Sequence, residues 1–203
     1  MMWYNLNLVV KRVFDIVSSF CAIVVLTPLW IVVGIWIKLD SEGPILFKQG
    51  RRTKDGRVFK MWKYRSMVVN AENIGSGLFS YDNDPRITKS GAILRKTSID
   101  ELPQLFNVLK GDMSIVGPRP HMLHHTEMYG KLIDDYMVRL FCKPGVTGLA
   151  QVTGFRGETK ELWQMEGRVK RDIYYVEHWS FWLDLKIIAM TFISIFKHDK
   201  NAF

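Results

Sequence analysis

The sequence has few cysteines and lacks the common short motifs for nucleotides and metals. Cys21 and Cys142 are the two cysteines in 203 residues, too few for a disulfide framework, which indicates a reduced, cytosol-facing protein. There is no Walker phosphate loop, no GxGxxG and no Cys-x-x-Cys, so nucleotide binding through a glycine-rich loop is not indicated. Internal repeats and low-complexity stretches are absent too. The length then allows one domain with a real core and little more.

Acidic residues are in the minority, with 20 Asp and Glu against 28 Lys and Arg and a net charge of +8. This excess favours an anionic partner: nucleic acid, a phosphorylated substrate or an acidic membrane face. Most of the charge lies between an apolar block near the N-terminus and a second apolar block that closes the chain.

The first apolar block carries no charge over residues 16–37. That is roughly the 20 residues needed to span a bilayer. It is too long for a cleaved signal peptide and no small-residue cleavage site follows. A buried helix of a soluble protein is the plain alternative. We predict a membrane anchor over residues 1–40.

Basic residues flank this block at both ends, beginning with Lys11 and Arg12 before it and Lys38 after it. Basic flanks prefer the cytoplasm, and a single span could place only one of them there. Thr27-Pro28 lies near the middle, where proline bends a helix and the threonine hydroxyl can satisfy a freed carbonyl. We predict a re-entrant helix broken at these two residues. A kinked ordinary span stays open.

The middle of the chain, residues 41–178, predicts a cytoplasmic domain that is mostly helical. Residues 45–49 and 57–64 are expected to form a β-hairpin around Asp55-Gly56. Residues 70–90 predict a polar loop. Helices are expected over residues 98–111, 123–140 and 163–178, with a tight loop at residues 143–148.

The C-terminal segment, residues 179–203, predicts an amphipathic element at the membrane interface, because its aromatic-rich part to Phe196 has Asp184 and Lys186 as its charges. Core packing explains that pattern almost as well. The fold class predicted from all these elements is α+β, mostly helical.

Asp100-Glu101 is the first candidate for chemistry. One interpretation is structural: Ser98 and Glu101 match a capping box at a helix start. The other is functional: adjacent carboxylates at a helix start could provide a nucleophile and a ligand for a hard cation such as Mg²⁺.

Pro118-Arg119-Pro120 is either a rigid turn with a solvated arginine or a stiff backbone that holds a guanidinium for bidentate phosphate contact. Several basic residues surround the acidic pair in sequence and together could neutralise a diphosphate. They are Lys60, Lys63, Arg65, Arg86, Arg95 and Lys96. His121, His124 and His125 have helical spacing, but a fourth ligand is missing nearby, which argues against zinc.

Residues 95–120 (RKTSIDELPQLFNVLKGDMSIVGPRP) resemble the signature of the bacterial sugar transferases, the monotopic polyprenyl-phosphate phosphoglycosyl transferases. The likeness begins at residues 11–15 (KRVFD) and continues through residues 63–67 (KYRSM) and 143–148 (KPGVTG). It ends at residues 179–186 (WSFWLDLK). Nearly the whole chain is covered, and a match of this length is very specific.

The resemblance implies a monotopic protein with a re-entrant helix broken at a Ser-Pro pair, here Thr27-Pro28. It also implies that Asp100 and Glu101 are catalytic, that Mg²⁺ is required, and that Pro118-Arg119-Pro120 helps bind the nucleotide. Larger members carry extra membrane helices and a regulatory domain, and we expect this chain to match the minimal members. Residues 156–203 look most like members that load glucose or galactose phosphate to start exopolysaccharide.

The function predicted is the transfer of a hexose 1-phosphate from a UDP-sugar to undecaprenyl phosphate with release of UMP. Asp100 is the expected nucleophile, and Asp100 and Glu101 the expected metal ligands, with Glu101 also able to handle protons. The expected phosphate clamps are Arg95 and Arg119, then Lys63 and Arg65.

The expected location is the bacterial inner membrane, in contact with lipid and with the catalytic domain on the cytoplasmic face. Nucleic acid is not an expected partner, and self-association stays open. The rival hypotheses are a membrane-anchored basic binding protein without catalysis and a structural subunit in which Asp100-Glu101 only caps a helix.

Overall fold

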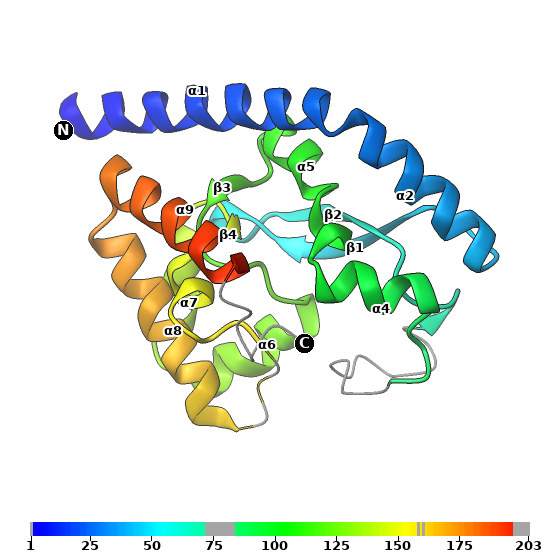
Figure 1. Ribbon diagram of the computed structural model, residues 1–203. Coiled ribbons are helices and arrows are strands. Elements are labelled where there is room, and N and C mark those ends of the chain that lie inside the picture. The colour runs from blue at the N-terminus through cyan, green and yellow to red at the C-terminus, as the bar shows by residue number, and fades with distance from the viewer. Residues whose placement is uncertain (1, 72–83, 158, 160, 197–203) are drawn as a thin grey trace.

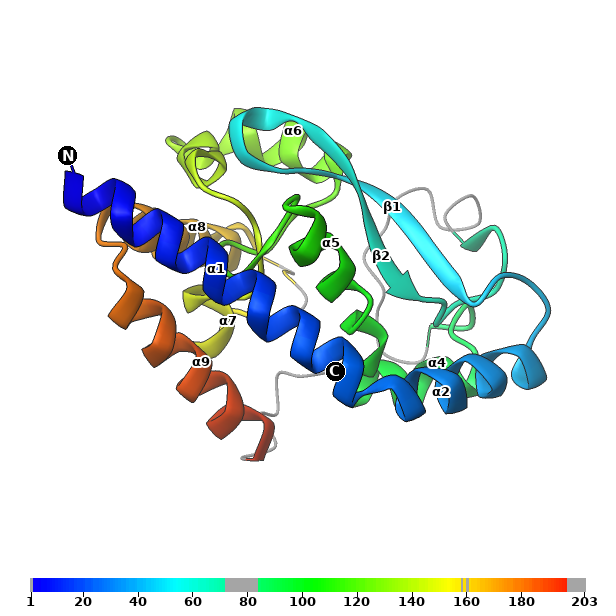
Figure 2. The same cartoon turned by 90° about the horizontal axis from the view of Figure 1, so that it is seen from above.

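The computed structural model describes residues 2–71, 84–157, 159 and 161–196. The chain is mostly helical, with a small antiparallel hairpin, as predicted (Figure 1). Two helices at the N-terminus extend over the top of the molecule. Seen from above, they cross it diagonally, with the last helix along one side and the hairpin on the other (Figure 2).

The N-terminal apolar block forms α1 (Met2–Val25) and α2 (Thr27–Asp40), which are bent by 63° at the break. Pro28 lies in the first turn of α2 and has no N–H to continue the hydrogen-bond ladder of α1. The Thr27 hydroxyl donates to the carbonyl of Ile23 at 3.1 Å, which satisfies one acceptor near the bend. Among the described residues no single helix has the length and hydropathy to cross a bilayer, but the bent pair has both together.

The outer faces of α1 and α2 are apolar, and their inner faces contact the rest of the chain. Asp15 and Ser19 of α1 are buried, and Val33 and Ile37 of α2 pack in a core cluster with Tyr64 and Leu94. The exposed apolar side chains of the pair include Val9, Val13, Val17, Phe20, Val24, Ile31, Val32, Ile35 and Leu39. The bent pair therefore exposes a continuous set of apolar side chains on the face turned away from the rest of the chain.

The predicted hairpin is formed by β1 (Leu46–Arg52) and β2 (Val58–Tyr64). The connection contains a 3₁₀ turn, η1 (Lys54–Gly56), in which Asp55 and Gly56 both have positive φ. Asp and Gly are the residues that accept this backbone region at least cost. The sequence signal and the observed turn agree.

The helix predicted over residues 98–111 is divided in two, so that prediction was wrong in part. A 3₁₀ turn, η2 (Ile99–Glu101), is followed by α5 (Gln104–Lys110), which ends at Gly111 with φ +94° as a left-handed cap. Ser98 has φ +59°, which separates η2 from the preceding helix, α4 (Lys89–Lys96). Residues 72–83 of the predicted loop lie outside the described residues.

Two short strands far apart in sequence form a parallel pair that was not predicted. In β3 (Ser114–Val116) and β4 (Gly145–Thr147), Ser114 lies opposite Gly145 and Val116 opposite Thr147. The chains approach closely where β3 ends: a Cβ on Gly117 would lie 2.4 Å from the carbonyl oxygen of Lys143. Glycine is therefore required just before the Pro-Arg-Pro turn.

The helix predicted over residues 123–140 is also shorter than expected. The chain forms α6 (Leu123–Leu132), then an extended Ile133 and a left-handed Asp135, and then the 3₁₀ segment η3 (Tyr136–Phe141). Aspartate tolerates the left-handed region. The break turns Tyr136 inward, and its side chain is buried.

The remaining helices are α7 (Leu149–Val152), α8 (Leu162–Glu177) and α9 (Phe181–Phe196). Helix α8 agrees with the helix predicted over residues 163–178, and α9 lies within the predicted C-terminal segment, residues 179–203. Residues 197–203 of that segment lie outside the described residues. A core cluster of Val116, Tyr175 and Ile187 joins β3, α8 and α9.

Candidate active site

The candidate site centres on Asp100 and Glu101 in η2, which contacts β2 and α4. Asp100 is 7% exposed. Lys63, on β2, places its Nζ 2.9 Å from Glu101 Oε1 and 3.9 Å from Asp100 Oδ2. One lysine therefore contacts both carboxylates.

Arg119 grips Glu101 from the other side. Its Nη1 donates to Glu101 Oε2 at 2.9 Å, and its Nη2 donates to Oε1. This is the two-pronged arginine–carboxylate geometry that gives both strength and direction. The predicted Pro-Arg-Pro turn and the predicted acidic pair are thus brought together, although they are 18 residues apart in sequence.

The capping-box interpretation of Ser98 and Glu101 was wrong. No side-chain cap bond forms at the start of η2, and the Glu101 carboxylate is bound by Lys63 and Arg119 instead. The Ser98 hydroxyl accepts from the guanidinium of Arg156. The Glu101 carboxylate therefore binds cations that are distant in sequence instead of the backbone N–H groups of its own turn.

The two carboxylates have opposite electrostatics. Burial raises the pKa of Asp100 above its usual value, although Lys63 opposes the shift. Burial acts in the same direction on Glu101, but Arg119 and Lys63 outweigh it and hold the pKa of Glu101 well below its usual value. Glu101 is accordingly held in its ionised form. For Asp100, the nearby cations do not offset the cost of burying its charge.

Arg95 lies in the last turn of α4, where it is within electrostatic reach of Asp100 and Glu101. Burial lowers the pKa of Arg95, and both carboxylates oppose that shift. Pro118 is buried and Pro120 is half-buried on either side of Arg119. These predicted residues therefore lie at or beside the acidic pair.

Arg65 is placed elsewhere. Its Nε donates to the carbonyl of Pro44 at 2.7 Å, and its two Nη atoms donate to the hydroxyl and carbonyl of Ser41 at 2.7 and 2.8 Å. These contacts tie the end of α2 to the end of β2. Its role in substrate binding stays a prediction, and the geometry gives it a structural one.

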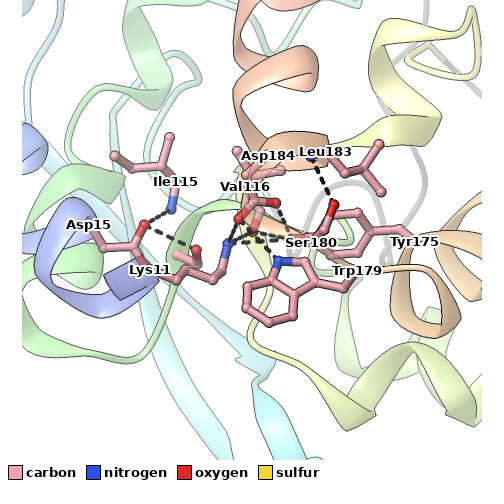
Figure 3. Close-up of polar contacts among 10 residues, drawn as sticks. Lys11, Asp15, Ile115, Val116, Tyr175, Trp179, Ser180, Leu183 and Asp184 are labelled. Carbon is pink, nitrogen blue, oxygen red and sulfur yellow. Dashed lines mark hydrogen bonds and ion pairs between the residues drawn. The ribbon is translucent and has the colours of Figure 1, made fainter. Parts of the chain in front are cut away.

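Figure 3 shows how α1 and α9 are joined at the strand that leads into the Pro-Arg-Pro turn. Lys11 Nζ lies 2.5 Å from Asp184 Oδ2 and donates to the carbonyl of Val116 at 3.0 Å. Tyr175 donates to Asp184 Oδ1 at 2.7 Å. Asp15 accepts from the backbone N–H of Ile115 at 2.9 Å. Helix α1 is thereby bonded to the backbone of β3, which leads into the turn that carries Arg119.

Asp100 and Glu101 differ in how well they suit a metal ion. Both oxygens of Glu101 already accept from cationic side chains, so a metal there would have to displace one of them. The described residues give Asp100 a single ion pair, at 3.9 Å. Mg²⁺ commonly uses one or two carboxylates and completes its shell with substrate phosphate and water. The donor set therefore fits Mg²⁺ held by Asp100 together with a diphosphate.

In the described part of the chain, no three His, Cys, Asp or Glu side chains are grouped as a metal site. His121 lies against Tyr136 and Arg139 rather than in a ligand cluster. Burial and the nearby Arg139 hold the pKa of His121 well below its usual value. His124 is exposed.

Sequence reasoning missed three residues near the site: Arg139, Asp172 and Arg156. Arg139 donates to the carbonyl of Arg119 at 2.7 Å and forms an ion pair with Asp172. None of the three lies in a recognisable motif, and Asp172 is one of several charged residues in its helix. The one usable signal would have been a charge at an inward-facing helix position, as for Asp172 in α8.

Comparison with known proteins agrees with this geometry. The family model described as "Bacterial sugar transferase" matches residues 6–198. The chain is 49% identical to a UDP-glucose:undecaprenyl-phosphate glucose-1-phosphate transferase of Klebsiella pneumoniae, over 98% of this chain and 42% of that protein. It is 47% identical to the protein of that name from Escherichia coli K12, over 97% of this chain and again 42% of the relative.

A third relative is of similar length: an exopolysaccharide production protein of Rhizobium leguminosarum, 45% identical over 97% of this chain and 100% of that protein. The chain thus spans less than half of the first two relatives and all of the third. The matched region includes the acidic pair, the Pro-Arg-Pro turn and the residues that tie α1 to them. The chain belongs to the bacterial sugar transferase family.

Proposed function

We propose that this chain transfers a hexose 1-phosphate from a UDP-sugar to undecaprenyl phosphate and releases UMP. The observation that carries the proposal is the asymmetry of the acidic pair. Glu101 is held by two cations, whereas Asp100 is buried beside it with one distant lysine. Family membership and the names of the relatives support the reaction class.

In the first step, an oxygen of the Asp100 carboxylate attacks the β-phosphorus of the UDP-sugar. The bond between that phosphorus and the bridging oxygen breaks, and UMP leaves with the bridging oxygen. The product on the protein is an aspartyl phosphosugar. A buried carboxylate with little hydrogen bonding is a better nucleophile than a fully paired one, so Asp100 suits this role better than Glu101.

In the second step, a phosphate oxygen of undecaprenyl phosphate attacks the same phosphorus. The aspartyl bond breaks, the carboxylate of Asp100 is restored, and the lipid diphosphate sugar leaves. One site can thus serve a soluble donor and a lipid acceptor in turn. The bond from the anomeric carbon to its oxygen stays intact, so the sugar keeps its configuration.

The cationic side chains have separate roles in this scheme. Lys63 lies between the two carboxylates and is placed to neutralise charge on the transferring phosphoryl group. Arg119 binds Glu101 and faces the same site, and Arg95 adds positive charge from α4. Mg²⁺, when bound by Asp100 and the diphosphate, would supply further positive charge to the phosphoryl oxygens.

We propose further that α1 and α2 form a re-entrant anchor in the inner membrane, with the catalytic domain on the cytoplasmic face. Both arms of the bent pair are bonded to one domain: Arg12 donates to the carbonyl of Val108 at 2.6 Å, and Asp40 accepts from the Ser90 hydroxyl at 2.8 Å. A spanning helix would put these two ends on opposite sides of the bilayer. The contacts therefore support an anchor that enters and leaves by one face.

Cysteine labelling tests this topology. In a Cys21→Ser/Cys142→Ser background, single cysteines are placed at two exposed positions: Asn7, in the N-terminal part of α1, and Glu42, just after α2. A membrane-impermeant maleimide should label both from the cytoplasmic side of inverted vesicles and neither from the periplasmic side of spheroplasts. Labelling of the two positions from opposite sides would refute the re-entrant anchor.

Glucose is the sugar that we favour, because the two relatives with the highest identity given above are named for UDP-glucose. A relative named as a galactose phosphotransferase, from Salmonella typhimurium, is 40% identical. UDP-galactose is therefore the second candidate. Both sugars were expected from the sequence.

The test is UMP release by the full chain in nanodiscs with undecaprenyl phosphate, Mg²⁺ and either UDP-glucose or UDP-galactose. Wild type should release UMP, and a folded Asp100→Asn variant should not. Equal activity in the two would remove Asp100 as nucleophile. Salt-sensitive nucleic-acid binding without UMP release would favour the non-catalytic alternative.

A further inference from the structure

A buried ion pair lies behind the Pro-Arg-Pro turn, outside the acidic pair itself. Arg139 of η3 and Asp172 of α8 approach to 2.7 Å, and they are 4% and 1% exposed. Burying two charges in this way gives little net stability, since desolvation offsets most of the attraction. A hydrophobic pair of similar size would serve packing as well, so stability alone gives no reason for these residues.

The guanidinium of Arg139 has contacts that an apolar side chain could not make. Its Nη2 donates to the backbone carbonyl of Arg119 at 2.7 Å, and its Nη1 donates to the hydroxyl of Tyr136 at 3.2 Å. The side chain of Arg119 holds Glu101 at its other end. Arg139 therefore fixes the main chain of the residue whose side chain fixes Glu101.

A second set of contacts leads from α8 to the site through residues 155–157. Arg168, one turn before Asp172, donates to the carbonyls of Phe155 and Gly157 at 3.0 and 2.9 Å. Burial lowers the pKa of Arg168 to about 10, and Arg119 and Arg139 contribute to the shift. The residue between those two carbonyls is Arg156, which donates to the hydroxyl of Ser98.

This arrangement contacts both segments of the acidic site. One branch reaches the backbone of Arg119, and the other reaches Ser98, two residues before Asp100. Because α8 supplies both Arg168 and Asp172, one rigid helix sets the two segments relative to each other. A displacement of that helix would change the distance between the guanidinium of Arg119 and the carboxylates.

We propose that Arg139 is a positioning residue for the transfer reaction, and that Asp172 holds it in place. Through the carbonyl of Arg119 it keeps the Arg119 side chain aligned on Glu101, beside Asp100. The proposal rests on the proposed function, because the alignment matters only if the acidic pair acts on substrate. Group positions that shift by about 1 Å can cost on the order of 100-fold in rate.

The experiment is a double-mutant cycle between Arg139→Lys and Arg119→Lys, with UMP release from UDP-glucose as the readout. Arg139→Lys keeps a charge beside Asp172, so the fold should survive, but it loses the planar fork that reaches two partners at once. We expect kcat to fall about ten-fold or more while the UDP-glucose KM changes less. In an Arg119→Lys background, the second substitution should change kcat little.

A matched control is Arg171→Lys, next to Asp172 on α8, whose guanidinium donates to the carbonyl of Gly167 at 3.0 Å. It should leave kcat and KM within about two-fold of wild type, since we place no reacting group near it. Thermal unfolding of every variant separates misfolding from misalignment. If Arg139→Lys does not fold, the neutral double variant Arg139→Gln/Asp172→Asn removes the charge imbalance and should show the same loss of kcat.

The outcomes are distinguishable. Equal fold-losses from Arg139→Lys in the wild-type and Arg119→Lys backgrounds would mean independent effects and would overturn the proposal, since residues acting through one another are not additive. An unchanged kcat in folded Arg139→Lys would also overturn it. Absence of UMP release by wild type would instead overturn the proposed function and this inference with it.

Discussion

Replacing Lys11 by methionine tests how strongly α1 is joined to α9 and β3. Lys11 is paired with Asp184 at 2.5 Å, and the two side chains are 15% and 3% exposed. Asp184 would keep the Tyr175 and Trp179 donors but would lose the cation. Removing one partner of a buried pair costs about 3–5 kcal/mol. Because two hydrogen bonds remain, we expect the lower end, about 3 kcal/mol.

In a domain of this size, 1 kcal/mol corresponds to about 2–4 °C in Tm, so Lys11→Met should lower Tm by about 6–12 °C. The assay is thermal unfolding of the full chain in one detergent. Lys110→Met is the control: its partner is Asp112, its own side chain is 76% exposed, and it should change stability by about 0.5 kcal/mol or less. A Tm for Lys11→Met equal to that of the control would refute the reasoning.

Three further predictions concern other parts of the chain. Asp100 must be ionised to attack and burial raises its pKa, so UMP release should rise with pH along a limb that lies above the usual range for an aspartate, and Lys63→Met should move that limb to still higher pH. Arg65→Met should lower Tm but leave the kcat of the folded protein nearly unchanged, since the hydrogen bonds of Arg65 go to the end of α2. A large loss of kcat at unchanged Tm would contradict this. Gly91→Ala should destabilise strongly in thermal unfolding, because its Cβ would lie 2.0 Å from a backbone carbonyl oxygen. Gly130→Ala, in α6, should instead stabilise by about 0.5–1 kcal/mol, because its Cβ would lie 3.6 Å from the nearest atom, the Sδ of Met137, which is an ordinary contact distance.

Local signals predicted the elements that depend on local physics. Proline at position 28, the Asp-Gly turn and the charged periodicity of α8 each act within a few residues, and the structure has the bend, the hairpin and the helix there. The pairing of β3 with β4 joins strands of three residues about 30 positions apart. Strands that short carry no usable periodicity, so this contact could not be predicted from pattern.

In the site, too, some residues were predicted from the sequence and others were not. The residues of the resemblance, Asp100, Glu101 and Arg119, lie together with Lys63. Arg65 is two residues after Lys63, but its guanidinium is bound by Pro44 and Ser41 at the end of α2 instead of lying at the acidic pair. The helix predicted over residues 123–140 is broken at two residues, the extended Ile133 and the left-handed Asp135, and neither residue type marks a helix end in the sequence.

The central claim is that Asp100 forms a covalent phosphosugar intermediate. The most direct measurement is isotope exchange: labelled UMP is incubated with UDP-glucose, Mg²⁺ and the enzyme, without undecaprenyl phosphate. A two-step reaction through Asp100 predicts that label enters UDP-glucose in wild type and that Asp100→Asn abolishes this exchange. If wild type transfers sugar phosphate to the lipid yet shows no exchange without it, the transfer is direct and the claim is contradicted.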